Sequence, residues 1–189
     1  MPVAVERVSV ALDAGLGVEG AARAARYAAY RAHGADIVAL AHHRDDQAET
    51  VLLQLVRGAG PAGLAGMPAW QPGAPALLRP LLAVERATIE DCARRRGLEW
   101  VHDASNEDPR FARNLVRGRV LPLLARINPA ATANLARSAG HLAAAQSLLQ
   151  ELGEADLAAI APAGRVRVEP LAQLGAARAR NALRICLER

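Results

Sequence analysis

Lysine is absent from this 189-residue sequence, so all 23 basic side chains are arginines. Aromatic residues are also scarce, at 3% of the chain, whereas hydrophobic residues make up 52% and charged residues 22%. This composition is typical of a globular protein and excludes a disordered chain. The core must be built from alanine, leucine and valine, which favours helices and parallel strands covered by helices. We therefore expect an α/β fold with much helix.

The sequence contains only two cysteines, Cys92 and Cys186, and they form no CxxC pair. This spacing indicates neither a zinc knuckle, a redox pair nor a disulfide framework, and it favours a reducing cytoplasm. No run approaches the roughly 20 consecutive apolar residues of a membrane helix. The first residues, MPVAVERVSV, do not follow the pattern of a signal peptide. We therefore expect a cytoplasmic protein without a membrane partner.

The formal net charge is +4, and the calculated pI is about 10.0. A moderate basic excess suits a polyanionic partner such as tRNA. Because the sequence is also rich in alanine, the missing lysine indicates biased codon usage rather than selection for guanidinium chemistry. The charge therefore permits a nucleic-acid partner without requiring one.

The predicted elements follow one another in the order of a parallel α/β sheet. A short β-branched run predicts a strand at residues 3–10, EGAARAARYAAYRAH predicts a helix at 19–33, and an apolar run predicts a buried strand at 37–41. Strand, helix and strand in this order form a βαβ unit. Later segments predict a Gly/Pro-rich loop at 60–75, a third apolar segment at 76–82, a helix at 84–96, a short strand at 98–103, a helix broken or kinked at Pro122, a long helix after 128, a β segment at 165–170 and a closing helix at 174–189.

The stretch HHRDDQAET follows the second strand directly, where ligands bind in parallel sheets. Within one helix His42, Asp45, Asp46 and Glu49 would share a face. Carboxylates grouped in this way can hold Mg²⁺ and leave positions for phosphate oxygens, and the amides of the first turn suit an anion. Alternatively, the acidic residues simply complement the helix dipole, since no metal signature such as HExxH is present. Spacing alone leaves both interpretations open.

Glycines and an arginine follow this helix. Arg57, Gly58 and Gly60 either end the helix and begin a flexible connection, or form a glycine-rich loop that closes over a ligand with Arg57 near phosphate. Composition does not decide between the two. The other histidines are interpreted as structural or surface residues; they are His33, His43, His102 and His141.

A second polar segment, HDASNEDPRFARNLVRGR, carries several candidate ligand-binding residues: Asp103, Ser105, Asn106, Asp108, Arg113, Asn114 and Arg117. Arg113 and Arg117 are four residues apart, so one helix can present both guanidinium groups to a phosphate or a carboxylate. The alternative is a solvated helix start.

Taken in order, these segments resemble the tRNA(Ile)-lysidine synthetases, a family of PP-loop ATP pyrophosphatases. The resemblance covers roughly the first two thirds of the chain and rests on VERV, GLGVEGAARAARYAAY, ALAHHRDDQAETVLLQLVRGAGPAGLAGM, LLRPLL and DASNEDPRFARNLVRGRVLPLL. Later helices, including ARSAGHLAAAQSLLQEL, are similar to the linking helical domain of the family. The resemblance implies a partial Rossmann-like parallel sheet at 1–125 and an incomplete α-helical linking domain at 126–189.

The resemblance also implies a ligase that uses ATP and Mg²⁺. Such an enzyme adenylates the wobble cytidine of an isoleucine tRNA at its C2 carbonyl oxygen, and the amine of free L-lysine then displaces AMP. On the family pattern, Asp46 and Glu49 would hold the metal or orient lysine, His42 would lie against phosphate, and Arg26 and Arg113 would stabilise phosphate or the adenylated base. The other implied substrate or ATP-binding positions are Asp45, Arg57, Gly58, Asn106, Asn114 and Arg117.

One element of the family pattern, the SGGxDS loop that holds pyrophosphate, does not occur in this sequence. GAGPAG at 58–63 cannot replace it, because it follows a helix instead of opening one after a strand. We therefore expect an N-terminally truncated fragment that does not complete the reaction alone, from a family that is often dimeric. Two alternatives stay open: another PP-loop tRNA-modifying enzyme such as a thiolase, although the CxxC pair common in that class is missing, and a non-catalytic remnant that binds RNA.

Overall fold

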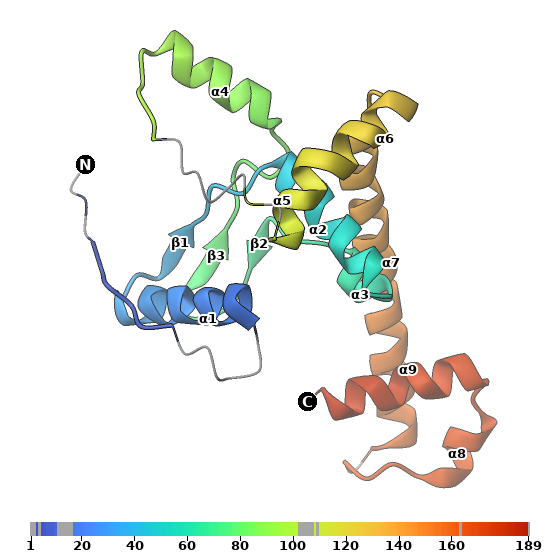
Figure 1. The fold of residues 1–189 in the computed structure, drawn as a ribbon. Helices are drawn as coiled ribbons and strands as arrows, with labels where there is room; N and C mark the ends of the chain where they lie inside the picture. Colours follow the sequence, from blue (N-terminus) through green and yellow to red (C-terminus); the bar gives the residue numbers. More distant parts are fainter. Residues whose placement is uncertain are drawn as a thin grey trace. The chain divides into compact units, whose positions relative to one another are not determined.

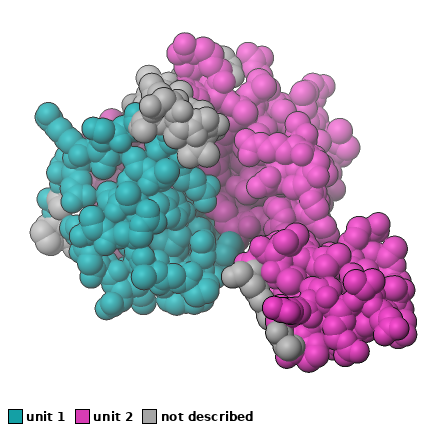
Figure 2. Space-filling view, turned by 90° about the horizontal axis from the view of Figure 1, so that it is seen from below, with its two compact units in different colours: residues 1–43, 68–85 teal, residues 44–67, 86–189 magenta. Residues whose placement is uncertain are grey.

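The computed structural model describes residues 3, 5–10, 17–101, 108, 110–162 and 164–188. The chain divides into two compact units (Figure 2): unit 1 comprises Met1–His43 and Pro68–Glu85, and unit 2 comprises Arg44–Met67 and Arg86–Arg189. Helices and a small sheet confirm the predicted α/β class. Among the described helices, none is long and apolar enough to cross a membrane. The domain boundary predicted after residue 125 stays a prediction.

Unit 1 contains a helix and a sheet of three short strands, in the order β1-β3-β2 (Figure 1). β1 pairs in parallel with β3, with Val38 opposite Leu77, and β2 pairs antiparallel to β3. The predicted helix and second strand are confirmed in this unit. Its elements are α1 (Gly17–Ala32), β1 (Ile37–Ala39), β2 (Trp70–Gln71) and β3 (Ala76–Leu78).

The strand predicted at 3–10 is wrong for the residues described there, which form no regular secondary structure. Val3 and Val5 are 87% and 86% exposed, so this run does not bury its apolar side chains. Glu6 and Arg7 interrupt the β-branched pattern, and no described strand pairs with it. The parallel partner of β1 is instead β3, which comes later in the chain.

β3 is followed by Arg79, one of the most buried large side chains in the described part of the chain. Its Nη1 donates a hydrogen bond to the carbonyl oxygen of Pro68 at 2.8 Å, and its Nη2 donates to Oε1 of Gln71 at 3.2 Å. The guanidinium therefore ties both ends of the β2 segment to the strand beside it.

Unit 2 is helical (Figure 1). Its elements are α2 (Arg44–Val56), α3 (Pro61–Leu64), α4 (Arg86–Arg95), α5 (Ala112–Leu115), the π-helix η2 (Val116–Val120), α6 (Leu121–Ile127), α7 (Ala131–Ile160), α8 (Val168–Gln173) and α9 (Ala176–Leu187). The predicted helices at 84–96, after 128 and at 174–189 are confirmed. The segment at 60–75, predicted as a loop, contains α3 in this unit and β2 in unit 1.

Two predicted β segments of unit 2 are wrong. Residues 98–101 form no strand, while His102 and Asp103 lie outside the described residues. Residues 165–167 are irregular and lead into α8. The backbone N–H of Arg167 donates to the carbonyl oxygen of Ile160 at 2.9 Å. This bond satisfies a carbonyl at the end of α7, so the segment caps a helix instead of joining a sheet.

The break predicted at Pro122 takes the form of a π-helix. Helical backbone continues from α5 through η2 into α6, and Pro122 lies at the start of α6. Proline lacks an N–H and its ring crowds the carbonyl four residues earlier, here that of Gly118. The wider π turn at Val116–Val120 accommodates the missing N–H and the crowded carbonyl before α6 begins. The chain therefore passes the proline without losing its helical course.

Two apolar clusters stabilise unit 2, and α7 contributes to both. Ala48, Val116 and Leu121 form the first, together with side chains that include Leu135 of α7. The second lies where α9 packs on the last turns of α7 (Figure 1) and consists of Leu157, Ile160, Ala182 and Ile185. The first cluster holds α2 against η2 and α6, which carry the residues of the candidate site.

Two glycines of α7 should respond oppositely to alanine. A Cβ on Gly153 would overlap Ile185 Cδ1 and lie 2.7 Å from Asn181 Nδ2, whereas one on Gly140 meets nothing within 4 Å. We expect Gly153→Ala to lower the free energy of unfolding by about 1–3 kcal/mol through overpacking. Gly140→Ala should raise it by up to about 1 kcal/mol, because alanine is the better helix former. Urea unfolding of both variants is the measurement, and equal effects would contradict the α7–α9 packing.

The ion pair between Asp156 of α7 and Arg178 of α9 predicts an acid-sensitive contact between these two helices. Arg178 binds both carboxylate oxygens, through Nη2 and, at 3.0 Å, through Nε. These hydrogen bonds lower the pKa of Asp156; burial opposes them, and the charge of Arg178 adds to them. A lowered folded-state pKa gives stability that is complete above the unfolded value of about 3.9 and is lost as pH falls through the folded value.

Asp156→Asn should therefore destabilise the protein above about pH 5, and the difference from the wild type should shrink as the pH falls below about 3.9. Urea unfolding at several pH values measures this difference. A difference that stays constant over the whole range would show that the carboxylate charge contributes nothing.

Candidate functional site

The acidic stretch predicted to share a helix face forms the start of α2. Asp45 and Asp46 lie in the first turn, and Glu49 follows in the second. Ala48 faces the apolar cluster, and the Thr50 hydroxyl donates to the carbonyl oxygen of Asp46 at 2.8 Å. His42 precedes the helix and belongs to unit 1. The prediction that all four acidic and histidine side chains share one helix face is therefore wrong for His42, because the helix begins at Arg44.

Glu49 is the centre of an ion-pair network. Its side chain is fully buried, and two arginines bind its carboxylate. Arg113 donates from Nε to Oε2 at 2.8 Å. Arg117 donates from Nε to Oε1 at 2.6 Å and from Nη2 to Oε2 at 3.0 Å. These are short, charge-assisted hydrogen bonds, which are about twice as strong as neutral ones.

Further contacts from Arg113 and Arg117 reach the first turn of α2. Arg117 Nη2 lies 3.3 Å from Asp46 Oδ1. Arg113 Nη2 donates to the Asp46 carbonyl oxygen and to Thr50 Oγ1, at 3.3 Å each. Two guanidinium charges are thus balanced by two carboxylates. We call Asp46, Glu49, Arg113 and Arg117 the arginine–carboxylate network.

The Arg117 pKa is raised within this network. Burial alone would lower it, but the hydrogen bond to Glu49 and the charges of Glu49, Asp46 and Asp45 outweigh burial. The side chains of Arg113 and Arg117 are 32% and 28% exposed, whereas that of Glu49 is 0% exposed. The arginines therefore form the accessible side of the network, and the carboxylate forms its buried side.

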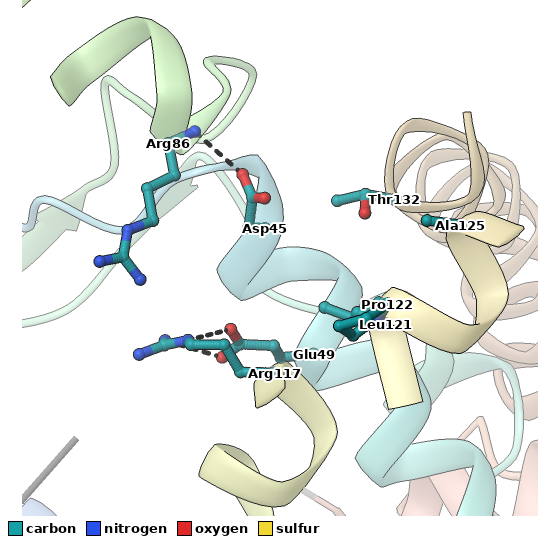
Figure 3. A pocket seen from close by; sticks show the side chains of 8 residues that line it. All are labelled: Asp45, Glu49, Arg86, Arg117, Leu121, Pro122, Ala125 and Thr132. Atoms are coloured by element: carbon teal, nitrogen blue, oxygen red, sulfur yellow. Dashed lines mark hydrogen bonds and ion pairs between the residues drawn. The ribbon is translucent and has the colours of Figure 1, made fainter. Parts of the chain in front are cut away.

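A pocket of about 230 Å³ adjoins this network (Figure 3). One wall is polar, and Asp45 Oδ2 in it accepts the backbone N–H of Arg86, at the start of α4, at 3.0 Å. The opposite wall comes from α6 and the start of α7 and is mostly apolar. The lining residues are Asp45, Glu49, Arg86, Arg117, Leu121, Pro122, Ala125 and Thr132. Such a pocket can hold a small ligand with both an apolar and a charged part.

Gln47 positions the segment around Met67 through two hydrogen bonds that the sequence did not predict. Its Nε2 donates to the Met67 carbonyl oxygen at 3.0 Å, and its Oε1 accepts the Met67 N–H at 2.8 Å. Gly66 has φ +69°, and a Cβ there would lie 2.8 Å from the Gln47 amide. The two hydrogen bonds between Gln47 and Met67 thus hold the end of the glycine-rich segment against α2. The positive φ and the nearby Gln47 amide explain why position 66 requires glycine.

Other predicted site residues lie outside the network. Gly58 ends α2 with φ +72°, and its N–H donates to the Leu55 carbonyl oxygen at 3.0 Å, which is the arrangement of a helix end. Arg57 beside it is exposed. Asn114 donates to the Asp108 carbonyl oxygen at 2.9 Å. Arg26 is exposed on α1 in unit 1. Asn106, like Asp103 and Ser105, lies outside the described residues.

As it is paired here, Glu49 does not fit a metal ligand. Its oxygens are closed to solvent and face two guanidinium cations. Like charges about 4 Å apart repel by roughly 4 kcal/mol per unit pair at an effective dielectric constant of about 20. In the described part of the chain, no group of three or more His, Cys, Asp or Glu side chains is arranged to hold a metal ion. The Mg²⁺ role of Asp46 stays a prediction, and no chemical step is assigned to a metal.

The sequence is similar to a known domain family and to named proteins. Residues 1–124 match the PP-loop domain of an ATP-binding family. Proteins named tRNA(Ile)-lysidine synthase match nearly the whole chain: that of Pseudomonas syringae pv. tomato is 50% identical over 96% of this chain and 43% of its own length. Those of Ralstonia nicotianae and Pseudomonas aeruginosa are 53% and 47% identical, over 97% and 99% of this chain and 40% and 45% of their own lengths. The chain thus spans less than half the length of these relatives.

Proposed function

The chain belongs to the PP-loop domain family, an ATP-binding family. We propose that it is part of an enzyme that joins lysine to the wobble cytidine of an isoleucine tRNA. The observation that carries the proposal is the identity of 47–53% to tRNA(Ile)-lysidine synthases over 96–99% of this chain. Free L-lysine, ATP and the tRNA are the substrates. The excess of arginine suits the tRNA phosphates.

The reaction has two chemical steps. The C2 carbonyl oxygen of the cytidine attacks the α-phosphate of ATP, and pyrophosphate leaves. The amine of lysine then attacks C2, AMP leaves with the oxygen, and the nitrogen loses a proton. Both steps develop negative charge on phosphate oxygens, so positioned cations are the main catalytic requirement.

Residues of the network and pocket supply these functions in our proposal. Arg113 and Arg117 stabilise phosphate charge, and both are held by buried hydrogen bonds. Asp45 and the apolar wall of the pocket suit the ammonium group and the alkyl chain of lysine. The remaining predicted ligand contacts stay proposals; they are Arg26, His42, Asp46, Arg57, Gly58, Asn106 and Asn114.

A chimaeric enzyme tests the proposal. This chain would replace the matching segment of the Pseudomonas aeruginosa relative, with which it is 47% identical. Purified chimaera, ATP, labelled lysine and isoleucine tRNA should yield lysine bound to the tRNA, at a rate comparable to that of the relative. A folded chimaera that binds tRNA in a salt-dependent way but transfers no lysine would refute the proposal and favour the RNA-binding alternative.

A further inference from the structure

Glu49 is the only member of the arginine–carboxylate network whose side chain is fully closed to solvent. Its two described ion-pair partners come from α5 and η2, more than sixty residues away along the chain. A ligand or metal could reach the carboxylate only by displacing a guanidinium group. Direct contact between this carboxylate and a bound ligand is therefore excluded while both arginines are in place.

The hydrogen bonds of the two arginines leave one end of each guanidinium unused. Arg113 and Arg117 bind Glu49, Asp46 and Thr50 through Nε and Nη2, and none of these contacts within the described part of the chain uses Nη1. Both side chains are nearly one third exposed. Glu49, Asp46 and Thr50 thus hold the Nε and Nη2 groups of the two guanidinium groups, and the Nη1 N–H groups of each are left for another acceptor.

We propose that Glu49 is a positioning residue that aligns Arg113 and Arg117 to bind one phosphate group, and that it touches neither the substrate nor a metal ion. The proposal rests on the proposed function, because it assigns phosphate as the ligand. It goes beyond that function because it assigns the buried Glu49 carboxylate to orienting two arginines and not to coordinating a metal ion. A planar guanidinium held at Nε and Nη2 binds phosphate with less loss of conformational freedom than a mobile one.

A purely electrostatic role and a positioning role of Glu49 predict opposite changes in anion affinity, and this affinity can be measured without metal. If Glu49 were only a negative charge near the phosphate site, Glu49→Gln would strengthen anion binding by removing repulsion. If Glu49 positions the arginines, the same change weakens anion binding, because the new amide N–H₂ faces guanidinium donors and releases them. Loss of a contact that orients a metal ligand typically costs about 10–100-fold in affinity, and we expect a loss of similar size for the oriented arginines.

Titration calorimetry with inorganic tripolyphosphate, in a metal-free buffer at neutral pH, is the test on the full chain. Glu49→Gln and Arg117→Ala should each weaken binding at least about tenfold. The double variant should bind no more than about twofold more weakly than Arg117→Ala, since both changes remove one coupled unit. Unchanged or tighter binding by Glu49→Gln, additive losses, or wild-type binding that Arg117→Ala does not alter would each overturn the proposal.

Matched variants separate positioning from folding. Glu49→Asp keeps the charge but shortens the reach, so it should also weaken binding; wild-type affinity in this variant would contradict the proposal even if Glu49→Gln did not fold. Asp91→Asn removes the acid beside exposed Arg95, 3.0 Å away on α4, and should change binding less than about twofold. Tripolyphosphate binding requires neither tRNA nor lysine, so it can succeed or fail independently of lysine transfer by the chimaera.

Discussion

Replacing Arg113 and Arg117 together by methionine should lower the free energy of unfolding by about 3–5 kcal/mol, the usual cost of leaving a buried ion without its partner. Glu49 is 0% exposed, so water cannot replace the lost hydrogen bonds without opening the packing around α2. Methionine keeps an apolar stem of similar length, which confines the change to charge and hydrogen bonding. Urea unfolding followed by circular dichroism measures the effect.

Two controls give this prediction its specificity. Adding Glu49→Met to the double variant should recover most of the lost stability, because replacing a whole buried ion-pair group by apolar side chains is often neutral. Arg119→Met changes an exposed arginine of the same π-helix and should alter stability by less than about 0.5 kcal/mol. A double variant as stable as Arg119→Met would contradict the network.

Arg113 should also be important for lysine transfer by the chimaera. Arg113→Lys should lower kcat/KM for lysine transfer by about 10²–10³-fold, the usual effect of removing one donor that stabilises developing charge. Lysine keeps the positive charge, but its single ammonium cannot bind Glu49, Asp46 and Thr50 as the guanidinium does. Transfer of labelled lysine at several tRNA concentrations gives kcat/KM.

Arg119→Lys is the matched control for this activity measurement, since Arg119 is exposed and lies outside the network. Its kcat/KM should stay within about threefold of the parent chimaera. If Arg113→Lys also stayed within that range while folding normally, Arg113 would have no part in the chemistry.

The helices were the most predictable part of the fold, because their signals are local. α1, α4 and α9 follow from helix-forming composition, and glycine marks the end of α1 and α4. The wrong strands, at 3–10, 98–103 and 165–170, depended on partners that a local pattern does not specify. At 165–170 the backbone of Arg167 had a competing role, as a cap for α7.

The candidate site was predictable in its members but not in its pairing. Spacing placed Arg113 and Arg117 together and left phosphate and carboxylate open as partners. The described structure pairs them with Glu49, 64 and 68 positions away in the sequence. That choice depends on the apolar contact of Ala48 with Val116 and Leu121, which no short motif encodes. The sequence likewise predicted the break at Pro122 but not the π turn at Val116–Val120 that precedes the proline.

Buried Glu49 accepts a hydrogen bond from Nε of both Arg113 and Arg117, and the Nε–H signals of these arginines in a ¹⁵N-resolved NMR spectrum test this shared pairing. Arg113→Lys and Arg117→Lys assign the two signals. We predict slow solvent exchange for both in the wild type and fast exchange for both in Glu49→Asp, because their shared acceptor is then out of reach. Wild-type signals that exchange as fast as those of exposed arginines, or protection that survives Glu49→Asp, would contradict this pairing.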